Sequence, residues 1–226
     1  MAVEIGNDGT LKVGAANAQV IVPCDISELE KEVLTPDGKL IIKPFAFWNS
    51  LDKNIIKIFI HTHAIYVLPT EELINWLKEN ILGTAIEIGA GNGSISRALN
   101  IPITDSRMQE REDIKIYYQV VGQPLIKYPD DVEKLDAEEA IKKYNPETVL
   151  GCFITHKFKE EIGSGNMYGV EEENILKAVK KYINIGNLTT HGAKPILKLK
   201  HEELYFDWLI TRSVNQTENR IFIWNK

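Results

Sequence analysis

Cysteine is scarce in this chain, and its scarcity limits how the protein is stabilised and where it is found. Cys24 and Cys152 are the only two cysteines, which is too few for a disulfide framework. We therefore expect two reduced thiols in a cytoplasmic protein. Cys152 lies in an apolar run without an adjacent charged activator, and we interpret it as a buried structural thiol.

Long hydrophobic runs and an excess of basic residues are also missing. No apolar run approaches the roughly 18 residues of a membrane span, and the N-terminal MAVEIGNDGT lacks the features of a signal peptide. The sequence has 26 Lys and Arg against 32 Asp and Glu, which gives a net charge of −6. This balance makes nucleic acid a disfavoured partner, although it leaves a local basic patch open. No membrane partner is expected.

Familiar nucleotide, redox and hydrolase motifs are absent as well. The sequence contains no P-loop and no C-x-x-C pair, and Gly163-Ser164-Gly165 lacks the spacing of the G-x-S-x-G nucleophile motif. What is present is an ordinary globular composition, with 44% hydrophobic and 26% charged residues over 226 positions. That length suits one domain with embellishments better than two full domains.

The most informative stretch is AIEIGAGNG, from Ala85 to Gly93. Its apolar, β-branched start predicts a buried strand, with Glu87 near the carboxyl end, where an open α/β sheet places its ligand crevice. Three glycines at alternate positions follow, which favour a tight turn and let a ligand approach the backbone. The next residues, SISRAL, predict a helix whose N-terminus faces the crevice.

Strand and helix patterns alternate along the rest of the chain. Thr70 is placed to cap a helix that ends before Gly83, and Asn145-Pro146 ends another helix. Helices are predicted at 71–82, 94–100, 107–121, 137–144 and 171–182, and strands at 85–88, 101–105, 131–136, 147–154, 182–186, 207–213 and 219–224. The last two strands are expected to form a hairpin. The glycine-rich loop 155–169 is a candidate mobile lid.

Residues 1–68 are expected to form an N-terminal extension of short strands that acts as a cover or an interaction segment. Turn signals at 7–9 and 36–38 separate the short runs TLKV, QVIV and KLII. Aromatic and β-branched residues then dominate 44–49 and 55–68. On a strand, His61 and His63 would point to the same face, but two histidines without a third ligand are a weak metal signal. We expect no metal site.

The spacing E-x-G-x-G-x-G from Glu87 to Gly93 resembles the first motif of Rossmann-like (class I) S-adenosylmethionine (SAM) dependent methyltransferases. It differs from the dinucleotide-binding pattern G-x-G-x-x-G. The resemblance covers residues 69–226 and implies an α/β fold with a doubly wound, mostly parallel sheet. This sheet closes with a C-terminal antiparallel hairpin, which plain dinucleotide-binding domains lack. The resemblance also implies SAM as the cofactor.

The resemblance assigns cofactor roles to residues near the ends of three strands. Glu87 and the glycine turn would hold the amino-acid end of SAM, and Asp105 would accept hydrogen bonds from the ribose hydroxyls. Asp136 and Ala137 would contact the adenine amino group. The full set is Glu87, Gly89, Ala90, Gly91, Gly93, Asp105, Asp136 and Ala137. For two of them a purely structural role stays open as an alternative: in that case Asp105 only starts a turn and Asp136 only caps a helix.

The catalytic position of the family usually follows the fourth strand. Amino-methylating DNA enzymes carry an Asp or Asn, Pro, Pro, aromatic run there, whereas this chain has CFITH, which ends at His156. The fifth strand is followed by a similar phrase that ends at His191. A neutral imidazole can take a proton from a hydroxyl, thiol or amine, so His156 and His191 are candidate catalytic bases. For each of them, a structural imidazole in a loop or core is the alternative.

Three hypotheses for function follow from the sequence. The first is a SAM-dependent methyltransferase that acts on a small molecule or a protein group. The second is a catalytically inactive methyltransferase-like protein that binds a ligand or partner, and the third is a nicotinamide-dependent oxidoreductase. Fold does not separate them, because one architecture hosts many functions. Neither the methyl acceptor nor the oligomeric state is predicted.

Overall fold

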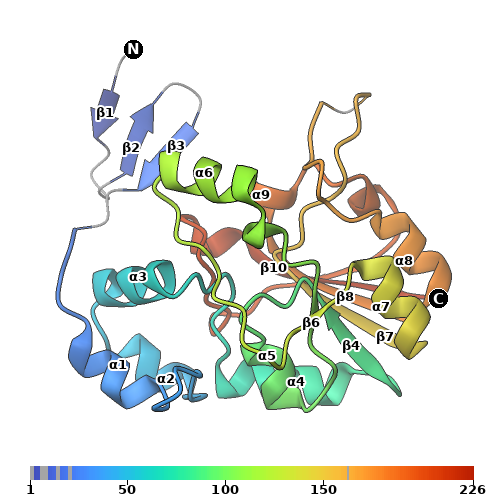
Figure 1. The fold of residues 1–226 in the computed structure, drawn as a ribbon, viewed down its shortest axis with the longest axis horizontal. Coiled ribbons are helices and arrows are strands. Elements are labelled where there is room, and N and C mark those ends of the chain that lie inside the picture. The colour runs from blue at the N-terminus through green and yellow to red at the C-terminus, as the bar shows by residue number, and fades with distance from the viewer. Residues whose placement is uncertain (1–2, 6–9, 14–15, 20–21, 162) are drawn as a thin grey trace.

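Seven strands form one mostly parallel sheet in the computed structural model, which describes residues 3–5, 10–13, 16–19, 22–161 and 163–226 (Figure 1). Their order is β6 (Glu133–Lys134), β5 (Thr104–Asp105), β4 (Ala85–Ile88), β7 (Thr148–Cys152), β8 (Lys181–Asn187), β10 (Asn219–Asn225) and β9 (Glu202–Leu204). The β5–β6 pair continues the sheet through a parallel bridge between Glu87 and Ile103. Strand β10 runs antiparallel to both of its neighbours, β8 and β9.

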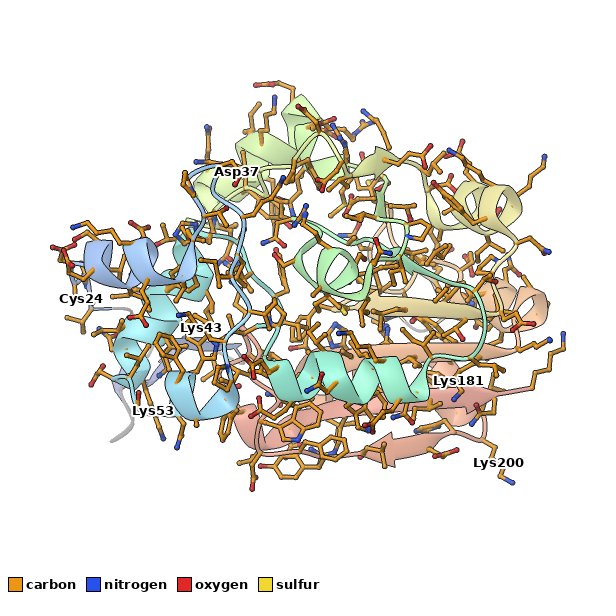
Figure 2. All side chains as sticks on the ribbon, turned by 90° about the horizontal axis from the view of Figure 1, so that it is seen from below. Cys24, Asp37, Lys43, Lys53, Lys181 and Lys200 are labelled. Atoms are coloured by element: carbon orange, nitrogen blue, oxygen red, sulfur yellow. The ribbon has the colours of Figure 1, made fainter. Side chains whose placement is uncertain are left out.

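Helices cover both faces of this sheet, and each face has its own hydrophobic core. Helices α4 (Glu71–Asn80) and α5 (Ser94–Leu99) pack against Ile183 and Ile185 of β8 on one face. Helices α7 (Ala137–Tyr144) and α8 (Glu172–Ala178) pack against Tyr182 of the same strand on the other. Figure 2 shows α4 in front of the sheet and running along the strands, with Lys181 beside its C-terminal end, where Lys181 Nζ donates to Asn80 O at 2.9 Å. The strand order and the two helical layers confirm the predicted Rossmann-like, doubly wound α/β fold.

Side chains three residues apart fix the starts of α4 and α7. The Thr70 hydroxyl oxygen accepts a hydrogen bond from Leu73 N at 3.2 Å. Asp136 accepts from Glu139 N at 2.9 Å, and the Glu139 carboxylate accepts in return from Asp136 N, also at 2.9 Å. This second arrangement is a capping box, in which two free donors of the first helical turn are satisfied. Both predicted helix starts are therefore confirmed.

The parallel strands bring their carboxyl ends to one edge of the sheet. Strand β4 ends at Ile88, β5 at Asp105 and β7 at Cys152, and in register Ile88 lies beside Gly151 of β7. The hydrogen bond from Ala90 N to Thr104 O, at 3.0 Å, holds the turn after β4 against β5. Open α/β sheets place their ligand crevice at this edge.

The N-terminal part contains more helix than the sequence predicts. The strands β1 (Val3–Ile5), β2 (Thr10–Val13) and β3 (Ala16–Gln19) form an antiparallel sheet, and the helices α1 (Ser27–Val33), α2 (Phe45–Asn49) and α3 (Lys53–Thr62) follow. The strand interpretation of 55–68 is therefore wrong. Ile56, Phe59 and Ile60 recur at helical spacing and pack with the fully buried Trp48, so one face of α3 is apolar.

The short runs predicted in this part fare differently. TLKV forms β2, whereas KLII contributes only an isolated bridge between Leu40 and Leu34. The turn at 7–9 and residues 20–21 of QVIV lie outside the described residues. Cys24 is exposed at the edge of the helical region, and it is a free thiol (Figure 2). The domain boundary at residue 68 stays a prediction.

The C-terminal antiparallel pair is built from other residues than predicted. Strand β10 contains the predicted strand 219–224, but its partner β9 comes from 202–204, and 207–213 forms no strand. Leu209 packs into the core beneath α4, and Ile210 packs against the cluster around Trp48. This segment therefore joins the sheet to the N-terminal helices, and burial on both sides overrides its strand-like composition.

Shorter elements complete the described chain. They are η1 (Met108–Glu110), α6 (Glu112–Val120), α9 (Leu188–His191), η2 (Pro195–Lys198) and η3 (Gln216–Glu218). The helix predicted at 107–121 is thus broken at Arg111, and the one predicted at 171–182 ends earlier because β8 begins at Lys181. None of the helices in the described ranges has the length and apolar character needed to cross a bilayer.

Candidate active site

A cavity of about 200 Å³, here called the main cavity, opens at the carboxyl ends of β4, β5 and β7. An adjoining space of about 570 Å³, here called the α7 hollow, extends it toward the start of α7. Both spaces are bordered by Gly89, Ser106, Met108, Tyr168, Gly169 and Val170. Together they reach the size of typical ligand pockets, about 300–1,000 Å³.

The glycine turn after β4 forms one wall of the main cavity. Gly89 and Gly91 have φ angles of 57° and 58°, in the left-handed region that glycine adopts without steric cost. A Cβ atom at Gly89 would lie 2.5 Å from Cδ1 of Ile154. The Gly91 amide donates to Asp105 Oδ2 at 2.9 Å, so the turn is tied to the end of β5. Ala90 lines the same wall, and the backbone here faces the cavity.

Two buried carboxylates border this wall. Glu87, which is 1% exposed, accepts hydrogen bonds from the amide of Ser96, at 3.1 Å, and from its hydroxyl. Burial raises the pKa of Glu87 to about 7, against the opposing effect of Ser96. Burial also raises the pKa of Asp105, which accepts from Gly91 N and, at 2.7 Å, from Arg107 N. The structure thus brings five predicted residues together: Glu87, Gly89, Ala90, Gly91 and Asp105.

Cys152 completes the wall at the end of β7. It is half-buried rather than fully enclosed, and it lines the main cavity close to Glu87. Burial raises the pKa of its thiol well above the usual value, and the Glu87 carboxylate acts in the same direction. The thiol therefore stays protonated near neutral pH, which agrees with the expected structural role of Cys152, although the residue is only half-buried.

We expect Glu87→Gln to be more stable than the wild type at pH 8, by up to about 3 kcal/mol of unfolding free energy. The pKa of Glu87 is about 7 in the fold against an ordinary 4.5. The stabilising contribution of Glu87 to the free energy of unfolding is therefore fully present below pH 4.5, and it is lost as the pH rises through 7. Glutamine stays neutral and keeps an oxygen for the Ser96 amide. Urea unfolding at several values between pH 5 and 8 measures the effect. A difference between variant and wild type that is constant over this range would contradict it.

Asp136 and Ala137 line the α7 hollow instead of the main cavity. The Asp136 carboxylate caps α7, as its alternative interpretation proposes, and its contact with a cofactor stays a prediction. Gly93 lines neither space: it precedes α5 as its N-cap, and its amide donates to Ala90 O at 2.9 Å. Gly93 therefore helps to shape the glycine turn without lining the main cavity.

His156 and His191 line neither space. Both are buried: Nε2 of His156 lies 3.2 Å from the Ser164 hydroxyl, and Nδ1 of His191 accepts from Asn187 N at 3.0 Å. Burial lowers the pKa of both imidazoles, that of His191 to about 3. Such an imidazole is a weak proton acceptor near pH 7. These buried positions do not favour a catalytic role for either histidine. That role stays a prediction.

His61 and His63 do not share a face, and the strand geometry predicted for them is wrong. Nδ1 of His61 accepts from Arg212 Nη2 at 3.1 Å, whereas Nε2 of His63 lies 2.8 Å from Glu30 Oε1. Within the described ranges, no three His, Cys, Asp or Glu side chains are grouped closely enough to hold a metal ion.

A further part of the cavity lining comes from the connection between β5 and β6, which sequence reasoning missed. Gln109 links its parts: its Nε2 donates to the Tyr118 hydroxyl at 3.2 Å, and its Oε1 accepts from Ile126 N at 2.8 Å. Burial raises the pKa of Tyr118 and Tyr128 well above the usual value, so both phenols keep their protons. The length of this connection is the signal in the sequence that could have indicated its role, because one short helix does not account for all of it.

The loop predicted as a lid reaches across the junction of the two spaces. Tyr168 borders both, and its hydroxyl donates to Asp113 Oδ2 at 3.1 Å. The Arg111 guanidinium lies 5.0 Å from the centroid of the Tyr168 ring. The loop is thereby anchored to the start of α6, and its opening as a lid stays a prediction.

Comparisons with known proteins return structural matches but no sequence matches. No protein-family model matches the chain, and no curated protein matches its sequence. An rRNA methylase from Streptococcus thermophilus is 12% identical, with a TM-score of 0.39 over 68% of this chain and 93% of its own. Precorrin-6y C5,15-methyltransferase from Geobacter metallireducens is 13% identical, with a TM-score of 0.37 over 70% and 89%. A variant of MtNAS is 11% identical, with a TM-score of 0.40 over 88% and 69%.

Proposed function

We propose that this protein is a SAM-dependent methyltransferase. The observation that carries the proposal is the wall of the main cavity, where the E-x-G-x-G-x-G turn and Asp105 meet at the carboxyl ends of β4 and β5. The antiparallel strand β10, which lies between β8 and β9, gives further support. A closing antiparallel pair is the element that distinguishes the methyltransferase resemblance from a plain dinucleotide-binding domain.

The residues of the cavity fit the chemistry of SAM. The backbone from Gly89 to Gly91 is open to a ligand, and Asp105 keeps lone pairs beyond its two amide bonds, so it can accept from ribose hydroxyls. Ala137 lies in the α7 hollow beyond, on the side that we assign to adenine. SAM supplies an activated methyl group when bound, so the protein has mainly to position the acceptor.

A second set of residues that line the main cavity is suited to hold that acceptor. Tyr66, Tyr118 and Phe153 offer aromatic surface, and Gln109 and Asn166 offer amide groups that can fix an orientation. We assign the acceptor to these residues, here called the acceptor wall.

Calorimetry with SAM and with S-adenosylhomocysteine, its demethylated product, tests the cofactor assignment. We expect both compounds to bind and to raise the Tm, since a ligand at about 100 times its Kd stabilises the folded state by about 2.7 kcal/mol. NAD should give neither effect. The absence of heat with both SAM and its product at millimolar concentration would reject the proposal.

Gly91→Trp should weaken this binding at least a hundredfold, because the indole would fill the cavity next to Ile126. Gly38→Trp is the matched control, since Gly38 also has a left-handed backbone, with φ of 78°, but has open space around it. It lies in a turn that borders neither space. Gly38→Trp should bind SAM as the wild type does. Full SAM affinity in a folded Gly91→Trp protein would place the cofactor elsewhere.

A further inference from the structure

Arg212 is the one arginine that lacks a carboxylate partner in the described part of the chain. The four others each form an ion pair with an Asp or Glu, and they are Arg97, Arg107, Arg111 and Arg220. Arg212 instead donates from Nη2 to Nδ1 of His61, at 3.1 Å, and to the amide oxygen of Gln123. Its Nη1 is buried and has no hydrogen-bond partner among the described residues.

Among the residues that the structure describes, none forms an ion pair with this guanidinium. Burial lowers the pKa of His61, with Arg212 acting in the same direction, so His61 is neutral near pH 7. Burial also lowers the pKa of Arg212, although arginine remains protonated in proteins, and the raised pKa of Tyr118 keeps its phenol neutral. A cation taken from water without a counter-ion is costly, and such costs are concentrated at functional sites.

The guanidinium lies directly behind the acceptor wall. Its central carbon is 5.0 Å from the centroid of the Tyr66 ring, and Arg212 N donates to Tyr66 O at 2.9 Å. Tyr66 and Tyr118 both line the main cavity. Gln123, which accepts from Nη2, is exposed and follows Gly122 at the end of α6. An anion that pairs with Nη2 therefore has to displace one neutral, exposed amide.

We propose that Arg212 binds an anionic group, a carboxylate or a phosphate, on a small-molecule methyl acceptor. This inference rests on the proposed function, because it takes the acceptor to occupy the cavity assigned to SAM. The planar fork of arginine matches two oxygens of either anion: Nη1 has no partner among the described residues, and Nη2 gains a free donor once Gln123 is displaced. The aromatic surface of Tyr66 and Phe153 favours an acceptor that carries a ring.

Benzoate, phenyl phosphate and benzamide test this inference, because they place a carboxylate, a phosphate or a neutral amide on the same ring. Calorimetry on the wild-type protein alone should show at least one of the two anions binding ten times more tightly than benzamide. The anion that binds more tightly identifies the acceptor's charged group. Equal affinity for all three compounds, or no binding of either anion at tens of millimolar, overturns the inference.

Arg212→Gln should remove the preference for anions while leaving the affinity for S-adenosylhomocysteine within a factor of two. Its Tm should be equal to or higher than that of the wild type, because an unpaired buried cation is removed. Arg212→Lys, which keeps the charge but not the planar fork, should lose most of the preference. Arg220→Gln is the matched control, since it removes an arginine paired with Glu203, and it should keep the full preference. Anion preference that survives in Arg212→Gln overturns the inference.

The failure of this inference and that of the proposed function give different results. If SAM binds and the anions bind no better than benzamide, only the assignment of the acceptor is wrong. If SAM does not bind but an anion binds through Arg212, the methyltransferase proposal is wrong and the anion site stands.

Discussion

Lys194→Met is expected to lower the free energy of unfolding by about 3–5 kcal/mol, because it leaves a buried carboxylate without its counter-charge. Lys194 is 2% exposed, and its Nζ lies 2.7 Å from Oε1 of Glu172, which is 1% exposed. The pair lies on the face of the sheet covered by α8, away from the walls of the main cavity. Loss of stability rather than loss of ligand binding should therefore be the result.

The remaining members of this network cannot replace the lysine. Tyr182 donates its hydroxyl to the same Glu172 oxygen at 2.8 Å, and Asn184 Nδ2 donates to the Tyr182 hydroxyl at 2.9 Å. The second oxygen, Oε2 of Glu172, has no partner among the described residues. Burial lowers the pKa of Lys194 and the Glu172 carboxylate opposes that effect. Each charge is thus stabilised mainly by the other. Removing one of them therefore lowers the free energy of unfolding by more than the intact pair contributes to it.

Urea unfolding of four proteins at pH 7.5 measures this coupling: the wild type, Lys194→Met, Glu172→Gln and the double variant. The double variant should recover at least half of the stability lost in Lys194→Met, because no buried charge remains and glutamine still accepts from Tyr182. Lys198→Met, at an exposed lysine of the adjacent η2, should change stability by no more than about 0.5 kcal/mol. A loss of less than 1 kcal/mol in Lys194→Met would show that the pair is not buried as described.

The elements that the sequence predicts correctly are those whose signals are local. Helices α4 and α7 begin at Thr70 and Asp136, each of which caps an amide only three residues away. Strands β4 and β7 are short apolar runs next to a glycine turn or a helix-ending Asn145. In each case both partners of the stabilising contact lie within one short segment, so a single sequence contains the whole interaction.

Segments whose conformation depends on distant packing were predicted wrongly. The β-branched and aromatic content of 55–62 favours a strand, but Phe59 and Ile60 lie on one helical face and pack on the cluster around Trp48. In the same way, 207–213 has the composition of a strand, yet Leu209 and Ile210 fill two different cores. The composition of a segment predicts that its residues will be buried, but tertiary packing determines whether the segment forms a helix, a strand or a loop.

The candidate site also has one part that the sequence predicts and one part that it does not. The glycine wall is predictable because Glu87 to Gly93 are continuous in sequence, and Asp105 is close behind. The acceptor wall is not, because Tyr66, Gln109 and Phe153 come from separate segments, and Arg212 behind it pairs with His61, which is 151 residues away. For His156 and His191, the catalytic role stays a prediction. Each follows a strand, as the family pattern requires, but the side chain is buried away from the cavity, and sequence position alone does not set its direction.

Through His191, the wild-type protein is expected to lose about 1.4 kcal/mol of unfolding free energy per pH unit below pH 6.5. The pKa of His191 is about 3 in the fold against an ordinary 6.5, first because of burial and then because of Lys194. Since the folded pKa is depressed, this contribution is fully present above pH 6.5 and is lost as the pH falls toward 3. The geometry agrees, because protonation of Nδ1 would cost the hydrogen bond from Asn187 N.

His191→Asn isolates this effect, since asparagine does not titrate and offers an oxygen near the position of Nδ1. The variant should be less stable at pH 7.5, because the contact of the imidazole with the Phe153 ring, whose centroid lies 4.8 Å away, is lost. The difference between wild type and variant should be constant above pH 6.5 and should shrink by about 2.7 kcal/mol at pH 4.5. Urea unfolding at four values between pH 4.5 and 7.5 measures it. A constant difference over this range would mean that His191 titrates normally, and it would restore the imidazole as a candidate base.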